Sequence, residues 1–163
     1  MPSHSIGAPS AVPLAEEIPN GPPPPDVVSE AAPPRTEPLA RRLQGFCTLV
    51  PELALETARQ IECAIQRGDK PGPLAGIPIG IKDLVCTKGI RTVSGSSAYA
   101  DFVPDEDDIV VERLKQAGAI IIGKTSVPEF GYSGVADNPV FPTTRNPWDL
   151  SRTPGGSSSG SGA

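Results

Sequence analysis

Apolar residues recur at helical spacing over residues 51–67. They form one stripe, which consists of Ala54, Leu55, Ala58, Ile61, Ala64 and Ile65. Pro51 opens the stretch at a position where a missing N–H costs nothing, and Glu52 stands near the positive end of the helix dipole. Gly68 follows as a typical stop. The pattern predicts an amphipathic helix that begins at Pro51 and ends near Arg67.

Two short runs rich in isoleucine predict strands, at residues 77–81 and 119–122. Pro78 favours an edge position for the first strand. Between the runs, residues 107–117 have helical spacing, acidic residues precede them, and Gly118 follows as a stop. The expected inward face of this helix is Ile109, Val110, Arg113, Leu114 and Ala117. A strand, a helix and a strand with short connections indicate parallel pairing in an α/β sheet covered by helices.

Composition divides the chain near residue 38. Eleven of the 21 prolines lie in residues 1–38, which contain no aromatic residue and no lysine. Such a segment lacks the apolar side chains that offset the entropy of ordering, so we expect a disordered, Pro-rich tail. Residues 39–163 have the usual size of one small domain. From residue 131 onward the spacing of proline and glycine predicts loops.

Charge and cysteine content exclude several classes of protein. The tail carries one Arg and five Asp or Glu, the remainder is nearly neutral, and the sequence pI is about 4.9. This balance argues against nucleic-acid binding. An apolar run long enough to span a membrane and a secretory signal are both absent from the sequence. The three cysteines form no CxxC pair and predict reduced thiols in a soluble, cytoplasmic protein.

Residues 118–125 match the P-loop pattern G-x-x-x-x-G-K-[ST], which cradles phosphate groups. The four intervening residues are Ala and three Ile, which favour extended backbone, so we interpret the stretch as the strand itself. Pro128 also falls in the first turns of the helix that a P-loop requires. We therefore reject nucleotide binding at this segment.

Residues 156–160 match G-x-S-x-G, the nucleophile pattern of α/β-hydrolases. That mechanism needs a histidine base, and His4 in the tail is the only histidine of the sequence. A Ser-His-Asp triad is therefore excluded. A histidine-based metal site is disfavoured for the same reason, and the sequence predicts no metal and no cofactor.

If the chain performs acyl transfer, a lysine must act as the base. A lysine can do so only when it is neutral, which burial or neighbouring positive charge favours. Lys82 is the candidate because it follows a predicted strand at its carboxyl end, where open α/β sheets place their ligands. The alternative is an ordinary surface lysine paired with Asp83. Lys124 also follows a predicted strand but is expected to be solvated.

The terminal run from Gly155 to Ala163 has two interpretations. A stretch of Gly and Ser is typical of a flexible linker. It is also typical of a loop whose amides and hydroxyls approach their neighbours closely and therefore need glycine.

Five segments taken together resemble the amidase signature family. They follow one another in the order and spacing of that family, roughly between residues 39 and 163. The segments are GPLAGIPIGIKD at 72–83, GKTSVPEF at 123–130, NPVF at 138–141, TRNPWD at 144–149 and TPGGSS at 153–158. The resemblance implies the N-terminal portion of the amidase-signature fold, an α/β fold with a mixed, largely parallel sheet covered by helices. It also favours the loop interpretation of the terminal run.

The resemblance implies a chemistry as well. Enzymes of this family cleave amide C–N bonds through an acyl-enzyme, using a triad of a serine, a second serine after a cis peptide bond, and a lysine. Carried over by motif, Lys82 is the base and Ser157 is the bridging serine, with the cis bond between Gly156 and Ser157. Gly155, Gly156 and Ser158 support the signature loop. Ser159 departs from the family pattern, in which glycine is usual at that position.

The nucleophilic serine of the family lies in a second glycine-rich segment further along the chain. We therefore expect residues 39–163 to be the N-terminal part of a catalytic domain, truncated before the nucleophile and inactive as it stands.

Three functions follow as alternatives. The first, which residues 138–141 favour, is a stand-alone amidase that hydrolyses a small carboxamide, with a homodimer as one arrangement. The second is the A subunit of a glutamyl-tRNA(Gln)/aspartyl-tRNA(Asn) amidotransferase with B and C subunits as partners. The third is a non-catalytic fragment that acts as a binding module. None of them implies direct contact with nucleic acid or a membrane.

Overall fold

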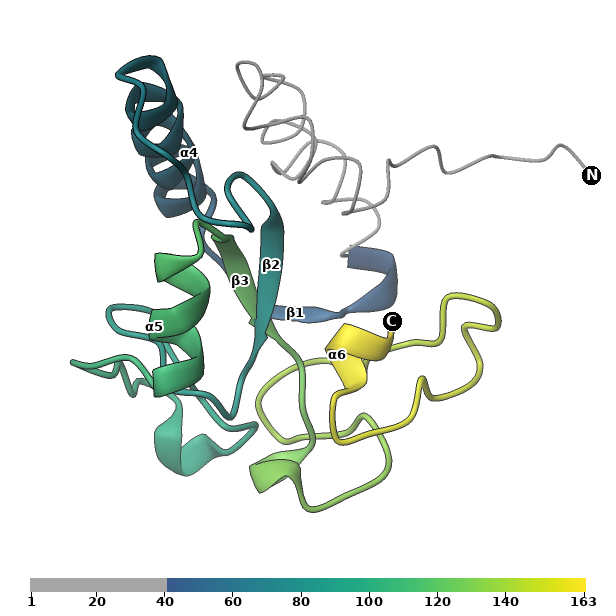
Figure 1. The fold of residues 1–163 in the computed structure, drawn as a ribbon. Coiled ribbons are helices and arrows are strands. Elements are labelled where there is room, and N and C mark those ends of the chain that lie inside the picture. Colours follow the sequence, from purple (N-terminus) through teal and green to yellow (C-terminus); the bar gives the residue numbers. More distant parts are fainter. Residues whose placement is uncertain (1–40) are drawn as a thin grey trace, which may run out of the picture.

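The computed structural model describes residues 41–163, and the disordered tail expected at residues 1–38 lies outside this range. Within it, three strands form one sheet: β1 (Phe46–Leu49), β2 (Pro78–Lys82) and β3 (Ile120–Thr125) (Figure 1). Their order is β1-β3-β2, with β2 parallel and β1 antiparallel to β3. The mixed α/β architecture, the parallel pairing and the edge position of β2 confirm the predictions from the sequence.

The predicted first helix is α4 (Pro51–Gln66). Its apolar stripe packs on β3, where Ala54, Leu55, Ala58 and Ile61 surround Ile120 and Ile122. Pro51 occupies the first turn, and Gly68 adopts a left-handed φ of 84° just beyond the end of the helix. The boundaries and the inward stripe of this helix agree with the prediction. Apolar residues that recur at helical spacing over 16 residues determine which side of the helix faces the core.

The second predicted helix is α5 (Ile109–Gln116), and its predicted inward face is right for Leu114 but wrong for Ile109 and Val110. Val111 is fully buried and Leu114 packs beside it, whereas Ile109 and Val110 are 62% and 50% exposed. Asp108 caps no N–H of this helix with its side chain. Its carboxylate accepts from the backbone N–H of Cys86 at 2.7 Å, so a neighbouring loop sets the rotation of the helix.

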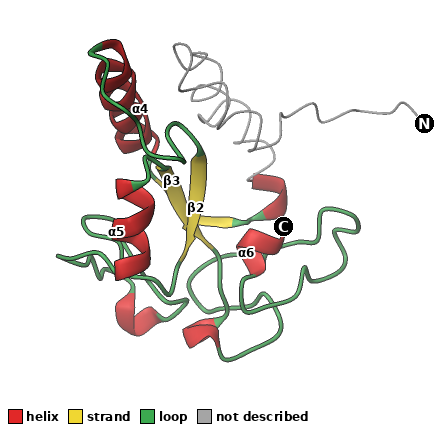
Figure 2. Cartoon of the chain, in the orientation of Figure 1, coloured by secondary structure: helices red, strands yellow, loops and turns green. Residues whose placement is uncertain are grey.

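Alternate residues of β3 contact different helices. Ile121 clusters with Val111 of α5, while Ile120 and Ile122 contact α4. Figure 2 shows the three strands at the centre of the described chain with the helices around them. These two contacts form the core that holds the carboxyl ends of β2 and β3 in place.

Strand β3 is longer than predicted, and this corrects the expectation for Lys124. The strand continues past Ile122 to Thr125, and it gains β1 as an unpredicted neighbour. Ile79 pairs with Ile121 but Gly80 pairs with Gly123, so Ile122 is an extra residue in the ladder. Such a bulge shifts the alternation of side chains. Lys124 is consequently buried, with no exposed surface, and not solvated.

The chain after the short turn η3 (Glu129–Gly131) contains no helix or strand over residues 132–158, in agreement with the predicted loops. It ends in α6 (Ser159–Gly162), which lies beside the sheet (Figure 1). The N–H of Gly160 donates to Ser126 O, and the N–H of Ser126 donates to Gly45 O, both at 2.9 Å. A Cβ on Gly160 would collide with the carbonyl of Gly45. Close backbone approach therefore fixes the terminal loop on the sheet.

Candidate active site

Lys82 and Ser157 lie side by side although 75 positions separate them in the sequence. The Nζ of Lys82 donates to the Oγ of Ser157 at 2.7 Å, in a partly buried setting. Lys82 is the last residue of β2, and Ser157 lies in the loop just before α6. The peptide bond between Gly156 and Ser157 is cis. An amine in this position that has lost its proton can accept the hydroxyl proton of the serine.

The sheet positions Lys82. In the parallel ladder Lys82 is the partner of Thr125, and the N–H of the following residue, Asp83, donates to Thr125 O at 3.1 Å. A Cβ on Gly80 would lie 2.7 Å from the Thr125 side chain and 3.1 Å from the ring of Phe46. Glycine at this position therefore allows Phe46 to cover the sheet on the side of Thr125.

Glycines and the docked α6 position Ser157. Gly155 has a left-handed φ of 91°, which favours glycine. Gly156 approaches another loop so closely that a Cβ there would lie 2.8 Å from the carbonyl oxygen of Ser133. Thr125 Oγ1 and Ser161 Oγ lie 2.9 Å apart, which ties α6 to the strand beside Lys82.

The other serines of the terminal loop have different surroundings. Ser158 is exposed and precedes α6 without a side-chain capping bond. Ser159, which stands where the family usually has glycine, is buried within α6 and its Oγ has no hydrogen-bond partner in the described structure. It is not among the described residues with positive φ, so the backbone accommodates a serine there.

A second lysine, Lys124, lies on the neighbouring strand, and the expectation that it is solvated is wrong. The Nζ of Lys124 donates to Val85 O at 2.5 Å, to Thr92 Oγ1 at 2.8 Å and to Thr87 Oγ1 at 3.1 Å. All three protons of an ammonium group are thereby used. The isoleucine run is shorter than the five or six residues that strands commonly have, which was a signal that β3 extends to Lys124 but not of which face its side chain occupies.

The partner of Asp83 is Lys124, not Lys82 as the surface-lysine alternative supposed. Asp83 Oδ1 lies 4.0 Å from Lys124 Nζ, and both side chains are buried. Burial raises the pKa of Asp83 and lowers the pKa of Lys124, while the charge of each partner opposes the shift of the other. Asp83 and Lys124 therefore form a buried structural pair on the face of the sheet opposite Lys82.

The cysteines of the described chain are free, as expected for reduced thiols. Cys47 Sγ donates to the carbonyl of Lys124 at 3.3 Å. Burial, and after it the negative charge of Asp83, raises the pKa of this thiol.

Residues 41–163 contain no group of three or more His, Cys, Asp or Glu side chains that could hold a metal ion. None of the helices described in this range is both long and apolar enough to cross a membrane.

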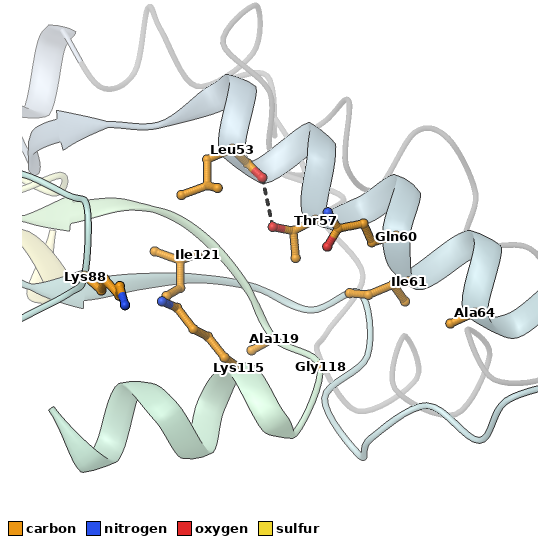
Figure 3. A pocket seen from close by; sticks show the side chains of 10 residues that line it. All are labelled: Leu53, Thr57, Gln60, Ile61, Ala64, Lys88, Lys115, Gly118, Ala119 and Ile121. Carbon is orange, nitrogen blue, oxygen red and sulfur yellow. Dashed lines mark hydrogen bonds between the residues drawn. The ribbon is translucent and has the colours of Figure 1, made fainter. Parts of the chain in front are cut away.

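A pocket of about 480 Å³ lies elsewhere, between α4 and α5 (Figure 3). Leu53 and Ile61 give it apolar walls, and Lys88 and Lys115 stand at one side. Lys115 is already paired with Asp107 at 2.6 Å. Neither residue of the Lys82–Ser157 pair lines this pocket, so it is a separate feature of the molecule.

Comparison with curated proteins finds relatives that are much longer than this chain. The A subunit of glutamyl-tRNA(Gln) amidotransferase from Carboxydothermus hydrogenoformans is 46% identical over 136 residues, which are 83% of this chain and 28% of the relative. The protein of the same name from Moorella thermoacetica is 48% identical over 126 residues, 77% of this chain and 26% of the relative. The chain thus spans little more than a quarter of these relatives.

Solved structures with the same fold include hydrolases. A chain of the vestigial protein complex that reveals the origins of an s-triazine catabolic enzyme has a TM-score of 0.87 and 34% identity, covering 95% of this chain and 34% of that one. A peptide amidase bound to chymostatin has a TM-score of 0.85 and 32% identity, covering 95% and 33%. The family model Amidase matches residues 28–163. This match covers most of the sequence, and the chain therefore belongs to the amidase signature family.

Proposed function

We propose that Lys82 and Ser157 form the proton-relay end of an amidase site. The 2.7 Å hydrogen bond between Nζ and Oγ is the observation that carries this proposal. The neutral amine of Lys82 takes the hydroxyl proton of Ser157, while Ser157 takes a proton from a nucleophilic serine. That serine attacks the amide carbonyl and forms an acyl-enzyme. The relay then returns a proton to the departing nitrogen, and water releases the acid.

The nucleophile belongs, in this proposal, to a part of the protein that follows the chain described here. The relatives are about three times as long as this chain, which supports a site completed by further sequence. The family match begins at residue 28, inside the tail predicted for residues 1–38. The proposed catalytic segment therefore includes the end of that tail together with residues 39–163.

Within the family we propose the A subunit of a glutamyl-tRNA amidotransferase, which releases ammonia from glutamine and works with B and C subunits. The named A subunits are 46% and 48% identical to this chain, whereas the two solved structures compared above, one of which is a peptide amidase, are 34% and 32% identical. This difference supports the transferase over the stand-alone amidase.

The segment 138–141, which favoured a stand-alone amidase, has a local structural role. Asn138 Oδ1 accepts from the N–H groups of Val140 and Phe141, and its Nδ2 donates to Val127 O at 2.8 Å. A residue that stabilises its own turn in this way carries little information about the substrate.

The test uses the complete reading frame that contains this chain, produced alone and together with B and C subunits. Ammonia release is measured with glutamine and with simple carboxamides, and transamidation is measured on glutamyl-tRNA(Gln). We expect release from glutamine that increases with the partner subunits present. Equal hydrolysis of simple carboxamides without partners would instead support the stand-alone amidase. A folded protein that cleaves no amide would support a binding module.

A further inference from the structure

The loop that follows β2 closes on itself at Asp83, the residue immediately after Lys82 in the sequence. The backbone N–H of Val93 donates to Asp83 Oδ2 at 3.1 Å, and the N–H of Ser94 donates to Asp83 O at 3.1 Å. Asp83 and Val93 are both fully buried. Residues 83–94 therefore form a closed loop whose two ends meet at Asp83.

The ammonium group of Lys124 donates three hydrogen bonds to this loop. Its three acceptors, Val85 O, Thr87 Oγ1 and Thr92 Oγ1, all belong to residues 83–94. The two threonines are buried, at 0% and 1% exposure. A buried ammonium persists in a protein when its donors are satisfied and a counter-charge is near, and the loop provides both.

Two structural routes lead from this loop to the Lys82–Ser157 pair. Along the first, Asp83 follows Lys82 directly, so the position of its backbone sets the end of β2. Along the second, Ser94 O accepts from the N–H of Phe130 at 2.8 Å, and a Cβ on the next residue, Gly131, would lie 3.7 Å from Ser157 Oγ. The loop of residues 83–94 therefore contacts both the end of β2, which carries Lys82, and the segment at Phe130 and Gly131, which lies beside Ser157.

We propose that Lys124 is a positioning residue for the Lys82–Ser157 pair, acting from the opposite face of the sheet by holding the loop of residues 83–94 closed. This inference rests on the proposed amidase function. It assigns Lys124 no contact with substrate. The loop places Lys82 and the turn beside Ser157 relative to each other, and loss of its closure misplaces the relay.

A mild change at one acceptor tests this better than removal of the lysine, because Lys124 variants risk unfolding. Thr92→Val removes the hydroxyl acceptor at nearly constant volume, and Thr92→Ser keeps it. Thr48→Val is a matched control. Thr48 pairs with Lys124 in the sheet, and its buried Oγ1 has no hydrogen-bond partner in the described structure.

The first readout is steady-state hydrolysis by the full-length enzyme with glutamine. For Thr92→Val we expect kcat to fall about tenfold with KM within about twofold of the parent, because misplacement affects the reacting geometry more than binding. Thr92→Ser restores most of kcat, and Thr48→Val behaves as the parent. Equal kcat for Thr92→Val and the parent, equal losses for Thr92→Val and Thr48→Val, or no rescue by serine would each overturn the proposal.

The second readout is amide hydrogen exchange on the same proteins, which needs no activity. We expect about tenfold faster exchange at the amides of Val93 and Ser94 in Thr92→Val but not in Thr48→Val. Unchanged exchange at these amides rejects the role of Lys124 whatever the activity. A parent enzyme that hydrolyses no amide rejects the proposed function instead, so the two failures are distinguishable.

Discussion

Lys82 and Lys124 occupy adjacent strands, one step apart in register, and their amines reach opposite faces of the sheet. Lys82 pairs with Thr125, while Lys124 pairs with Ile81, and successive side chains of a strand alternate between faces. One amine contacts Ser157, and the other contacts the loop of residues 83–94. The two lysines therefore have different environments, and substitutions at them have different consequences.

Removal of the Lys82 amine is expected to abolish most of the activity without unfolding the protein. Lys82→Ala in the full-length enzyme loses the base of the proposed relay, and amide hydrolysis falls about 10³-fold. Ammonia release measures the effect, and circular dichroism checks the fold. Lys70→Met, at an exposed lysine between α4 and β2, serves as the control. Near-normal hydrolysis by Lys82→Ala would remove the mechanism.

Ser157→Ala is expected to lower the same rate by several orders of magnitude. Because the two residues act as one relay, the double variant with Lys82→Ala should be no slower than the slower single variant. Ser151→Ala, at an exposed serine of the same loop region, should retain the parent rate. Multiplicative losses in the double variant would show that Lys82 and Ser157 act independently.

Gly160→Ala is expected to destabilise the docking of α6. Its Cβ has no space beside Gly45 and the N–H of Ser126. Overpacking of this kind costs about 1–3 kcal/mol, and the displaced loop carries Ser157 with it. Urea unfolding and amide hydrolysis should both report the change. Gly134→Ala is the control because nothing lies within 4 Å of a Cβ at that position. Comparable stability of the two variants would contradict the tight docking.

Lys124→Met is expected to reduce the free energy of unfolding by about 3–5 kcal/mol, because the carboxylate of Asp83 is left buried without its counter-charge. Asp83→Asn in the Lys124→Met background removes that charge and should recover part of the loss. Urea denaturation of the parent, both single variants and the double variant measures the coupling. Strict additivity of the two single effects would show that the pair does not interact.

The buried thiol of Cys47 predicts a loss of stability at alkaline pH. In the unfolded chain the thiol ionises near its ordinary pKa of 9.0, whereas burial and the charge of Asp83 raise the pKa in the folded chain. Above pH 9 the folded state therefore binds more protons than the unfolded state, and stability falls as the pH rises. This contribution is fully present below pH 9.

Comparison with Cys47→Ser isolates this effect, because a hydroxyl does not ionise in that range. We expect its stability to fall less between pH 8 and pH 10.5 than that of the parent in urea unfolding. Cys63→Ser, at an exposed cysteine, should follow the parent. Identical slopes for Cys47→Ser and the parent would contradict the raised pKa.

The elements that could be predicted from the sequence are those with long or strongly typed patterns. Helix α4 has about four turns with regularly spaced apolar residues. The isoleucine runs of β2 and β3 indicate a buried pair of parallel strands. The motifs that name Lys82 and Ser157 could be identified without coordinates, because glycines and prolines at fixed spacing mark them. Their catalytic roles stay predictions.

The features that were missed depend on contacts between distant segments. Strand β1 has four residues and pairs only because β3 extends to Thr125. The bulge at Ile122 depends on the partner strand, and it decides which face Lys124 occupies. The rotation of α5 depends on hydrogen bonds that Asp107 and Asp108, just before the helix, accept from a loop some twenty positions earlier. Local periodicity contains none of this information.

The anchor of α6 joins Gly45, Ser126 and Gly160, three segments that are far apart in the sequence. Contacts between distant residues form slowly because closing the intervening chain costs entropy before any contact forms. During synthesis on the ribosome, the strands of the sheet emerge before the residues that anchor the serine. Lys82 is therefore part of the chain before Ser157 has been synthesised, and the hydrogen bond between Lys82 and Ser157 forms only after the strands of the sheet are available.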